Sequence, residues 1–267
     1  MSEFPPFPDG LLESAAELGA ITDRSARIWL RVPGEPIITG TLQVDDECAV
    51  SAQVRLSEET DWTGSIEFEL DSPAPRHSFT VDIAGRELHG RFAPSPGSRV
   101  GLTFAFGSCN EPFSNDDGEI IYHGSAPIYE SLLHDIQRAE CEFLLLGGDQ
   151  IYSDLLDPLD VRQGLLDLDD DDDTRAEALK RYRTVTRGFF QARGFRELRD
   201  ALPTYCIWDD HDIFDNWGSQ QSESKMDRIM FEAASRAYCE YQHGRNPGAM
   251  IADPPYHYTF QYGDVGF

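Results

Sequence analysis

The sequence has little positive charge and almost no lysine. Lysine and arginine together number 22 against 48 acidic residues, and lysine occurs only at Lys180 and Lys225. The formal net charge is therefore −26 at pH 7. Nucleic-acid backbones and anionic membranes would repel such a chain, so we expect neither as a partner. The excess of acid is compatible either with adaptation to high salt or with a GC-rich genome.

Patterned cysteines and long apolar runs are also lacking. The five cysteines are odd in number and irregularly spaced, and no CxxC motif occurs, which argues against a disulfide framework and against a zinc ribbon. No apolar run approaches the roughly 20 residues that cross a bilayer. The first residues, "MSEFPPFPDG", show no basic and apolar segments of a secretory signal. We therefore expect a soluble chain, located in the cytoplasm.

The hydrophobic content is that of a packed globular protein, at 40% of residues with 11% aromatic. Residues 1–92 contain several short segments that alternate between apolar and polar residues, such as "SARIWLRV" at 25–32. Short alternating strands with turn-rich gaps and no helical stretch predict a small β-sandwich. The Pro/Ser/Gly segment 93–98 is typical of a domain boundary. We therefore predict a first domain over residues 1–98.

Residues 99–267 have a different pattern, in which apolar strands alternate with helices. Strands are predicted in "VGLTFAFGSCN", "CEFLLLGGDQIY" and "TYCIWDDHD", and "YHYTFQYGDVGF" begins a further strand. Helical spacing is found at 125–140, 184–202 and 226–241. This alternation predicts an α/β domain with a sheet buried on both faces.

Each of the first three strands ends in a polar cluster. In open α/β sheets, ligands bind beyond the ends of the strands. We therefore expect Cys109, Asp149 and Tyr152 to converge with the acids of "WDDHD". Adjacent carboxylates repel one another, so such a cluster indicates a bound cation.

The residue types suggest which cation. Asp149 follows two glycines and has two carboxylate oxygens, so it could bridge two ions. Asp210 offers a hard oxygen ligand. The Cys109 thiolate and the Tyr152 phenolate suit iron, because Fe(III) is acidic enough to lower the pKa of a phenol. Taken singly, Cys109 and Tyr152 would more often be ordinary buried residues.

Several neighbours receive weaker interpretations. The Asp212 carboxylate could orient and charge the His211 imidazole, forming a catalytic pair. Asp209 is assigned a turn or supporting role, and Asn216 is a candidate contact to metal or phosphate. The acidic run 167–173 lacks the glycine and terminal glutamate of an EF-hand loop, so we expect a solvated, mobile segment.

The motifs resemble those of a known family. "GSC" at 107–109, "GDQIY" at 148–152 and "WDDHD" at 208–212 resemble the three N-terminal motifs of the PhoD-like alkaline phosphatases, a branch of the metallophosphatases. "ELGAITDRSARIWLRV" at 17–32 is similar to the β domain that precedes the catalytic domain in that family. The resemblance covers essentially the whole chain. It implies a β-sandwich followed by a metallophosphatase-type αββα domain.

The resemblance also implies roles for individual residues. Cys109 and Tyr152 would bind Fe(III), and Asp149 would bridge Fe(III) and Ca(II). Asp210 would be a further ligand, at a place where relatives carry asparagine. His211 would lie beside the substrate phosphate and steady the transition state or protonate the leaving oxygen.

The implied activity is hydrolysis of a phosphomonoester or phosphodiester by a metal-bound hydroxide. Two alternatives remain open at this point, namely diester cleavage of the phospholipase D type and a non-catalytic, truncated phosphatase fragment. Many family members are exported behind a twin-arginine signal, which is not seen in this sequence.

One departure from the family bears on activity. The remaining metal-binding histidines of the family lie beyond "GDVGF", in a "GD-x-H"-like motif, whereas this sequence ends at Phe267. The resemblance therefore predicts an incomplete metallophosphatase domain over residues 99–267, the N-terminal portion of a longer enzyme. We expect the 267-residue chain to aggregate or to be inactive unless a missing C-terminal half or a partner chain completes it.

Overall fold

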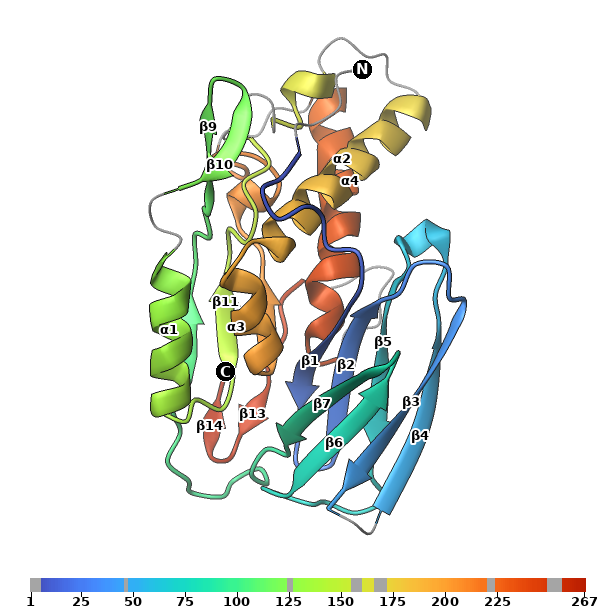
Figure 1. Cartoon of the computed structure of the whole chain (residues 1–267), viewed down its shortest axis with the longest axis vertical. Helices are drawn as coiled ribbons and strands as arrows, with labels where there is room; N and C mark the ends of the chain where they lie inside the picture. Colours follow the sequence, from blue (N-terminus) through green and yellow to red (C-terminus); the bar gives the residue numbers. More distant parts are fainter. Residues whose placement is uncertain are drawn as a thin grey trace.

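The N-terminal part of the chain forms two antiparallel sheets (Figure 1). The computed structural model describes residues 6–45, 48–123, 127–154, 160–165, 172–219, 224–248 and 256–267. One sheet has the order β1-β2-β5 and the other β4-β3-β6-β7. The strands are β1 (Ala15–Ile21), β2 (Ser25–Arg31), β3 (Ile37–Val44), β4 (Cys48–Arg55), β5 (Thr63–Glu69), β6 (Ser78–Ile83) and β7 (Arg86–Arg91).

One hydrophobic cluster joins the two sheets. Ile28 and Phe68 from the first sheet lie in the same cluster as Leu42 and Val81 from the second. Strand β3 alternates between buried and exposed positions, as expected for a strand with one face in a core. Burying one such aliphatic or aromatic side chain stabilises a fold by about 1.5–3 kcal/mol, so this cluster holds the sheets together.

Strand β2 departs from a simple inside-outside pattern, because all seven of its residues are buried. The face that carries Trp29 and Arg31 packs against the C-terminal part of the chain. The Trp29 indole donates a hydrogen bond to the carbonyl of Glu240 at 2.7 Å, and the Arg31 guanidinium donates one to the Tyr241 hydroxyl at 3.2 Å. The alternation in the sequence marks two different faces, but it does not show that the polar face is also covered.

The C-terminal part contains the three predicted strands as a parallel sheet of order β12-β11-β8. These are β8 (Ala105–Gly107), β11 (Leu144–Gly147) and β12 (Thr204–Ile207). Residues 92–104, which lead from β7 to β8, contain no helix or strand.

Other elements of the chain pack against both faces of this sheet. Leu144 and Leu146 belong to the main hydrophobic cluster together with residues of helices α1 (Pro127–Arg138) and α3 (Phe195–Ala201). On the other face, Tyr205 stacks on Phe260 with ring centroids 4.1 Å apart. Helices therefore cover one face of this sheet, and an aromatic segment covers part of the other, where Phe106 of β8 stays 62% exposed.

The helices agree with the sequence patterns in part. Helices α1 and α4 (Lys225–Tyr241) fall on predicted segments. The segment predicted as one helix at 184–202 is instead the end of α2 (Asp172–Gln191) followed by α3. Gly194 separates them with a φ of 79°, and a Cβ atom at this position would lie 2.5 Å from Tyr129.

Two further hairpins are present in the described part of the chain. Strands β9 (Phe113–Asp116) and β10 (Glu119–Tyr122) pair around Asp117 and Gly118, both with positive φ, which is the turn chemistry of a tight hairpin. The predicted strand at the end of the chain is also a hairpin, β13 (Gln261–Tyr262) with β14 (Val265–Gly266). Gly263, with a φ of 60°, reverses the chain there. The segment thus begins a strand, as predicted, but the strand ends after two residues and turns back on itself.

Short 3-10 helices occur at η1 (Glu58–Thr60), η2 (Gln163–Leu165), η3 (Asp210–Asp212) and η4 (His243–Arg245). Most of the acidic run 167–173 lies outside the described residues, and Asp172 and Asp173 form the first turn of α2. Carboxylates in a first turn favour the helix because of its dipole. Among the described residues, no helix combines the length and apolar character of a membrane span.

Candidate metal centre

The three polar clusters meet at one edge of the parallel sheet. Gly107 is paired in register with Leu146, and Gly147 with Ile207, so the strands end at the same level. The chain then places Cys109, Asp149 and Asp210 beyond these ends. A close approach at Gly148 brings two of the loops together, since a Cβ atom there would lie 2.6 Å from that of Asp209.

Cys109 and Asp149 are in direct contact. The Cys109 thiol donates to the Asp149 carboxylate, with Sγ 3.4 Å from Oδ2. Both residues have a left-handed backbone, with φ of 58° and 53°. A left-handed conformation costs a residue with a side chain of the order of 1 kcal/mol or more, and such strain is typical of functional sites. Here it turns the thiol and the carboxylate towards each other at the ends of β8 and β11.

Asp149 lies in a group of closely spaced carboxylates. Ligand oxygens of Asp149, Asp209 and Asp210 all lie within 4.8 Å of one another. Within the described part of the chain, neither lysine nor arginine forms an ion pair with any of the three. Burial raises the pKa of Asp149, and the charges of Asp209 and Asp210 add to this. A cation at this position would relieve the repulsion.

The side chain of Tyr152 is buried beside the same group. Burial raises the pKa of its hydroxyl, and the nearby Cys109 and Asp149 raise it further. A phenol in this environment stays protonated unless a strongly acidic ion binds it. The tyrosine ring lies against the imidazole of His211, with centroids 4.4 Å apart.

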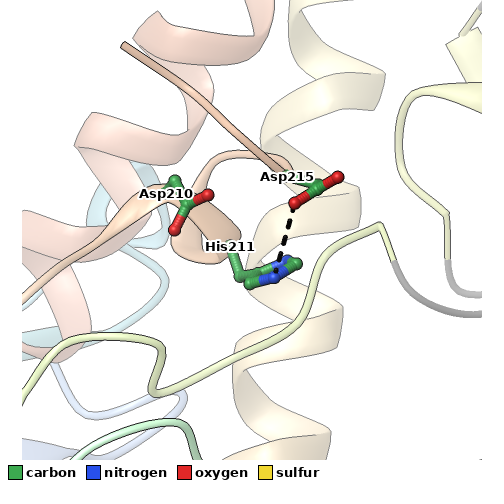
Figure 2. Close-up of side chains that lie close together, drawn as sticks. All are labelled: Asp210, His211 and Asp215. Atoms are coloured by element: carbon green, nitrogen blue, oxygen red, sulfur yellow. Dashed lines mark ion pairs between the residues drawn. The ribbon is translucent and has the colours of Figure 1, made fainter. Parts of the chain in front are cut away.

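Asp210 and His211 belong to η3, directly after β12. Asp209 begins this short helix, and its side chain accepts a hydrogen bond from the Asp210 amide at 2.9 Å, so it has the turn role that the sequence predicted. Asp210 in turn accepts a hydrogen bond from the Asn216 amide at 2.6 Å. Figure 2 shows Asp210, His211 and Asp215 gathered on one loop, and their ligand atoms also lie within 4.8 Å of one another.

The predicted pair of His211 with Asp212 is not formed. Asp212 is buried, and its two oxygens accept hydrogen bonds from the Asp209 amide at 3.0 Å, the Gln150 amide at 3.4 Å and the Gln242 side chain at 2.8 Å. These contacts tie the end of β12 to the end of β11. Burial raises the pKa of Asp212 to about 7, although the hydrogen bonds oppose this. The Asp212 side chain therefore points into the interior, and its contacts give it a structural role.

His211 contacts a carboxylate that the sequence interpretation missed. Its Nδ1 atom lies 2.9 Å from Oδ1 of Asp154, and its Nε2 atom lies 3.8 Å from Oδ1 of Asp215, the pair drawn in Figure 2. Burial lowers the pKa of His211, but Asp154 together with the charges of Asp149 and Asp210 outweighs this, so the net shift is upward. In the sequence, Asp154 is marked only by its position two residues after Tyr152. That position does not show where its side chain points.

An apolar cavity of about 590 Å³ opens next to Cys109. Phe106, Ile128 and Leu132 line it, and His123 lies at its wall. Asn216, the other candidate contact, is exposed and has a φ of 62°, and its amide rather than its side chain contacts Asp210.

The described residues fit the metals that the resemblance implies. Cys109, Asp149 and Tyr152 bring a thiol, a carboxylate and a phenol together, and Asp210 adds a second carboxylate at the same strand ends. The repulsion among the acids and the raised pKa of Tyr152 are both features that a highly charged ion would reverse.

Comparison with known proteins identifies a family and a solved structure of similar fold. The model of the PhoD-like phosphatase family matches residues 104–266. A solved structure of PhoD superposes with a TM-score of 0.68 at 17% identity, covering 98% of this chain and 51% of that chain. The present chain therefore spans about half the length of that protein. No curated protein matches the sequence.

Two further solved structures are similar only in part. An fn3 domain of human collagen alpha-1(XX) chain matches 39% of this chain and 98% of its own length, at 19% identity and a TM-score of 0.21. A β-D-mannosidase from Dictyoglomus thermophilum matches 88% of this chain and 34% of its own length, at 8% identity and a TM-score of 0.32. With such low TM-scores neither bears on the function.

Proposed function

The chain belongs to the PhoD-like phosphatase family, and on that premise we propose that it is a metal-dependent phosphoester hydrolase of the alkaline phosphatase D type. The observation that carries the proposal is the contact of Cys109 with Asp149 at 3.4 Å, beside carboxylates that have no lysine or arginine partner among the described residues. We also propose that residues 1–98 form a β-sandwich domain and that residues 99–267 belong to a metallophosphatase-type domain.

The proposed metals are Fe(III) and Ca(II). Cys109 and Tyr152 would hold the iron, Asp149 would bridge both ions, and Asp210 would contribute a further carboxylate. When bound, the two ions would supply positive charge that stabilises the phosphoryl oxygens of the transition state.

The protein's own groups would orient the substrate and move the proton. The Nδ1 atom of His211 is engaged by Asp154, so its Nε2 atom is the one available to a substrate oxygen. We propose that a protonated His211 donates from Nε2 to the leaving oxygen, a step for which a positioned side chain contributes about 10²–10⁴-fold in rate. Asp212 would keep the two loops in register through its hydrogen bonds to backbone amides.

Visible absorption tests the proposed iron site. Loading the protein with Fe(III) should give a charge-transfer band that Tyr152→Phe or Cys109→Ser shifts or removes. Tyr122→Phe, in the β9–β10 hairpin, is the matched control and should keep the band. An iron complex whose band is the same in all four proteins would contradict the assignment.

Diester cleavage of the phospholipase D type remains a second candidate, favoured by the apolar cavity beside Cys109. The two activities are separated by comparing kcat/KM for a small aryl phosphomonoester with that for a phospholipid diester. The cavity predicts that Ile128→Asp would reduce diester turnover more than monoester turnover.

A further inference from the structure

We propose that Asp154 is the positioning residue for His211. The inference deepens the proposed function, because it concerns the histidine assigned to the leaving oxygen. It replaces the expected partner Asp212, whose oxygens are taken up by amide groups of Asp209, Gln150 and Gln242.

The Asp154 carboxylate contacts the histidine loop with both of its oxygens. Oδ1 lies 2.9 Å from His211 Nδ1, and Oδ2 accepts a hydrogen bond from the Asp215 amide. The Asp154 side chain is only 9% exposed, against 64% for Asp215. One buried carboxylate therefore fixes the imidazole and the backbone four residues beyond it.

The neighbouring residue strengthens this attachment. The Ser153 hydroxyl donates to the carbonyl of Ile213 at 2.7 Å and lies 3.1 Å from that of His211. The Ser153 amide also donates to the carbonyl of His211 at 3.2 Å. Residues 153 and 154 thus hold the loop on its backbone and at its imidazole. The segment after β11 therefore holds the loop that carries His211 in place.

This arrangement determines which ring nitrogen is free. A carboxylate only accepts hydrogen bonds, so the contact with Asp154 places a proton on Nδ1. The Tyr152 ring, with its centroid 4.4 Å from that of the imidazole, restricts rotation of the histidine side chain. Nε2 is then left for the reaction. The other flanking carboxylate, Asp215, is 3.8 Å from Nε2 and largely exposed, so it cannot hold the ring in the same way.

The test is ¹⁵N NMR of the metal-free 267-residue protein labelled at its seven histidines. His211 is assigned from the spectrum of the His211→Ala variant, and the protein is studied at a pH where the imidazole is neutral. The wild-type protein should show His211 as the tautomer protonated at Nδ1. Protonation at Nε2 would overturn the proposal without any variant.

Two substitutions separate the flanking carboxylates. Asp154→Asn should abolish the preference for the Nδ1 proton, whereas Asp215→Asn, the matched control, should preserve it. An unchanged tautomer in Asp154→Asn, or an equal change in Asp215→Asn, would overturn the proposal.

Steady-state kinetics test whether Asp154 contributes to catalysis. In protein that hydrolyses phosphoesters, Asp154→Asn should lower kcat by about 10²-fold with KM changed by less than about twofold, because only orientation of the proton donor is lost. A rise in KM with an unchanged kcat would contradict the role. The NMR result does not require activity, so failure of this inference is distinguishable from failure of the proposed function.

Discussion

Glu17 shows how a single buried residue joins the two parts of the molecule. It lies on β1, and its carboxylate pairs with Arg199 of α3 at 2.5 Å and with Arg245 of η4. All three side chains are at most 1% exposed. The Arg245 guanidinium also lies 4.0 Å above the Trp29 ring. Burial alone would raise the pKa of Glu17, but the two guanidinium groups outweigh this and lower it to about 2.

Glu17→Gln should therefore destabilise the fold strongly. Removing the charge leaves two buried arginines without their partner, and breaking a buried ion pair in this way costs about 3–5 kcal/mol in the free energy of unfolding. Denaturant unfolding at neutral pH measures the loss. Glu67→Gln is the matched control, because Glu67 also pairs with an arginine at 2.5 Å but is 49% exposed, and it should cost less than about 1 kcal/mol.

The same pair predicts how stability depends on pH. The pKa of Glu17 in the folded protein is about 2, below its ordinary value of 4.5. Its contribution to stability is complete above 4.5 and is lost as the pH falls towards 2. The difference in unfolding free energy between the wild type and Glu17→Gln should shrink over this interval. A difference that stays constant down to pH 2 would contradict the assigned pKa.

At the scale of residues, the sequence predicts which side-chain chemistry is present at the site better than it predicts where each side chain points. Cys109, Asp149 and Asp210 are found at strand ends, where their positions after apolar runs placed them. The partner of His211 was wrongly predicted because adjacency in sequence favours Asp212. A side chain in a short 3-10 helix points away from its neighbour, so Asp212 turns inward and Asp154 approaches from the preceding loop.

Among the elements, β12 is an edge strand whose outer side is covered by a side chain. The Asn246 amide group accepts a hydrogen bond from the Cys206 N–H at 2.9 Å and donates one to the Cys206 carbonyl at 2.7 Å. This side chain therefore imitates a neighbouring strand at one position. The Tyr258 hydroxyl donates to the same carbonyl at 3.0 Å.

Asn246→Ala should loosen the edge of the sheet at the strand that leads into η3. The Cys206 N–H would be buried without an acceptor, which costs about 1–3 kcal/mol. Hydrogen exchange should show faster exchange of the Cys206 amide. Asn246→Asp keeps the acceptor and should protect this amide better than alanine does. Equal exchange in the wild type and Asn246→Ala would show that the contact does not protect the strand.

The elements differ in how far their sequences determine them. Apolar runs ending in polar clusters indicated β8, β11 and β12, because strands covered on both faces leave no polar positions until they end. The hairpin β13–β14 was predicted as one strand because its aromatic residues conceal the turn at Gly263. The break between α2 and α3 depends on the contact of Gly194 with Tyr129, which only the folded chain reveals.

The whole molecule combines a large negative charge with an apolar edge. The net charge of −26 favours solubility through repulsion between copies. Strand β8 is the other edge of the described parallel sheet, and Phe106 on it is 62% exposed. An exposed apolar edge strand is a site for pairing with another chain.

We predict that the 267-residue chain self-associates through β8. Phe106→Glu should lower the apparent mass in light scattering at constant salt, because it places a charge on the apolar edge. Ile37→Glu, at an exposed apolar position in the N-terminal sheets, is the control and should have little effect. A monodisperse wild-type monomer would contradict the prediction.

The central claim is that Cys109, Asp149, Tyr152 and Asp210 share bound cations. Anomalous diffraction from crystals grown with iron and calcium tests it most directly. We predict an iron peak within ligand distance of Cys109 Sγ, the Tyr152 hydroxyl and the Asp149 carboxylate, and a calcium peak on the other side of Asp149 within reach of Asp210. Ordered metal bound elsewhere, with these four side chains turned away from any common ion, would contradict the account.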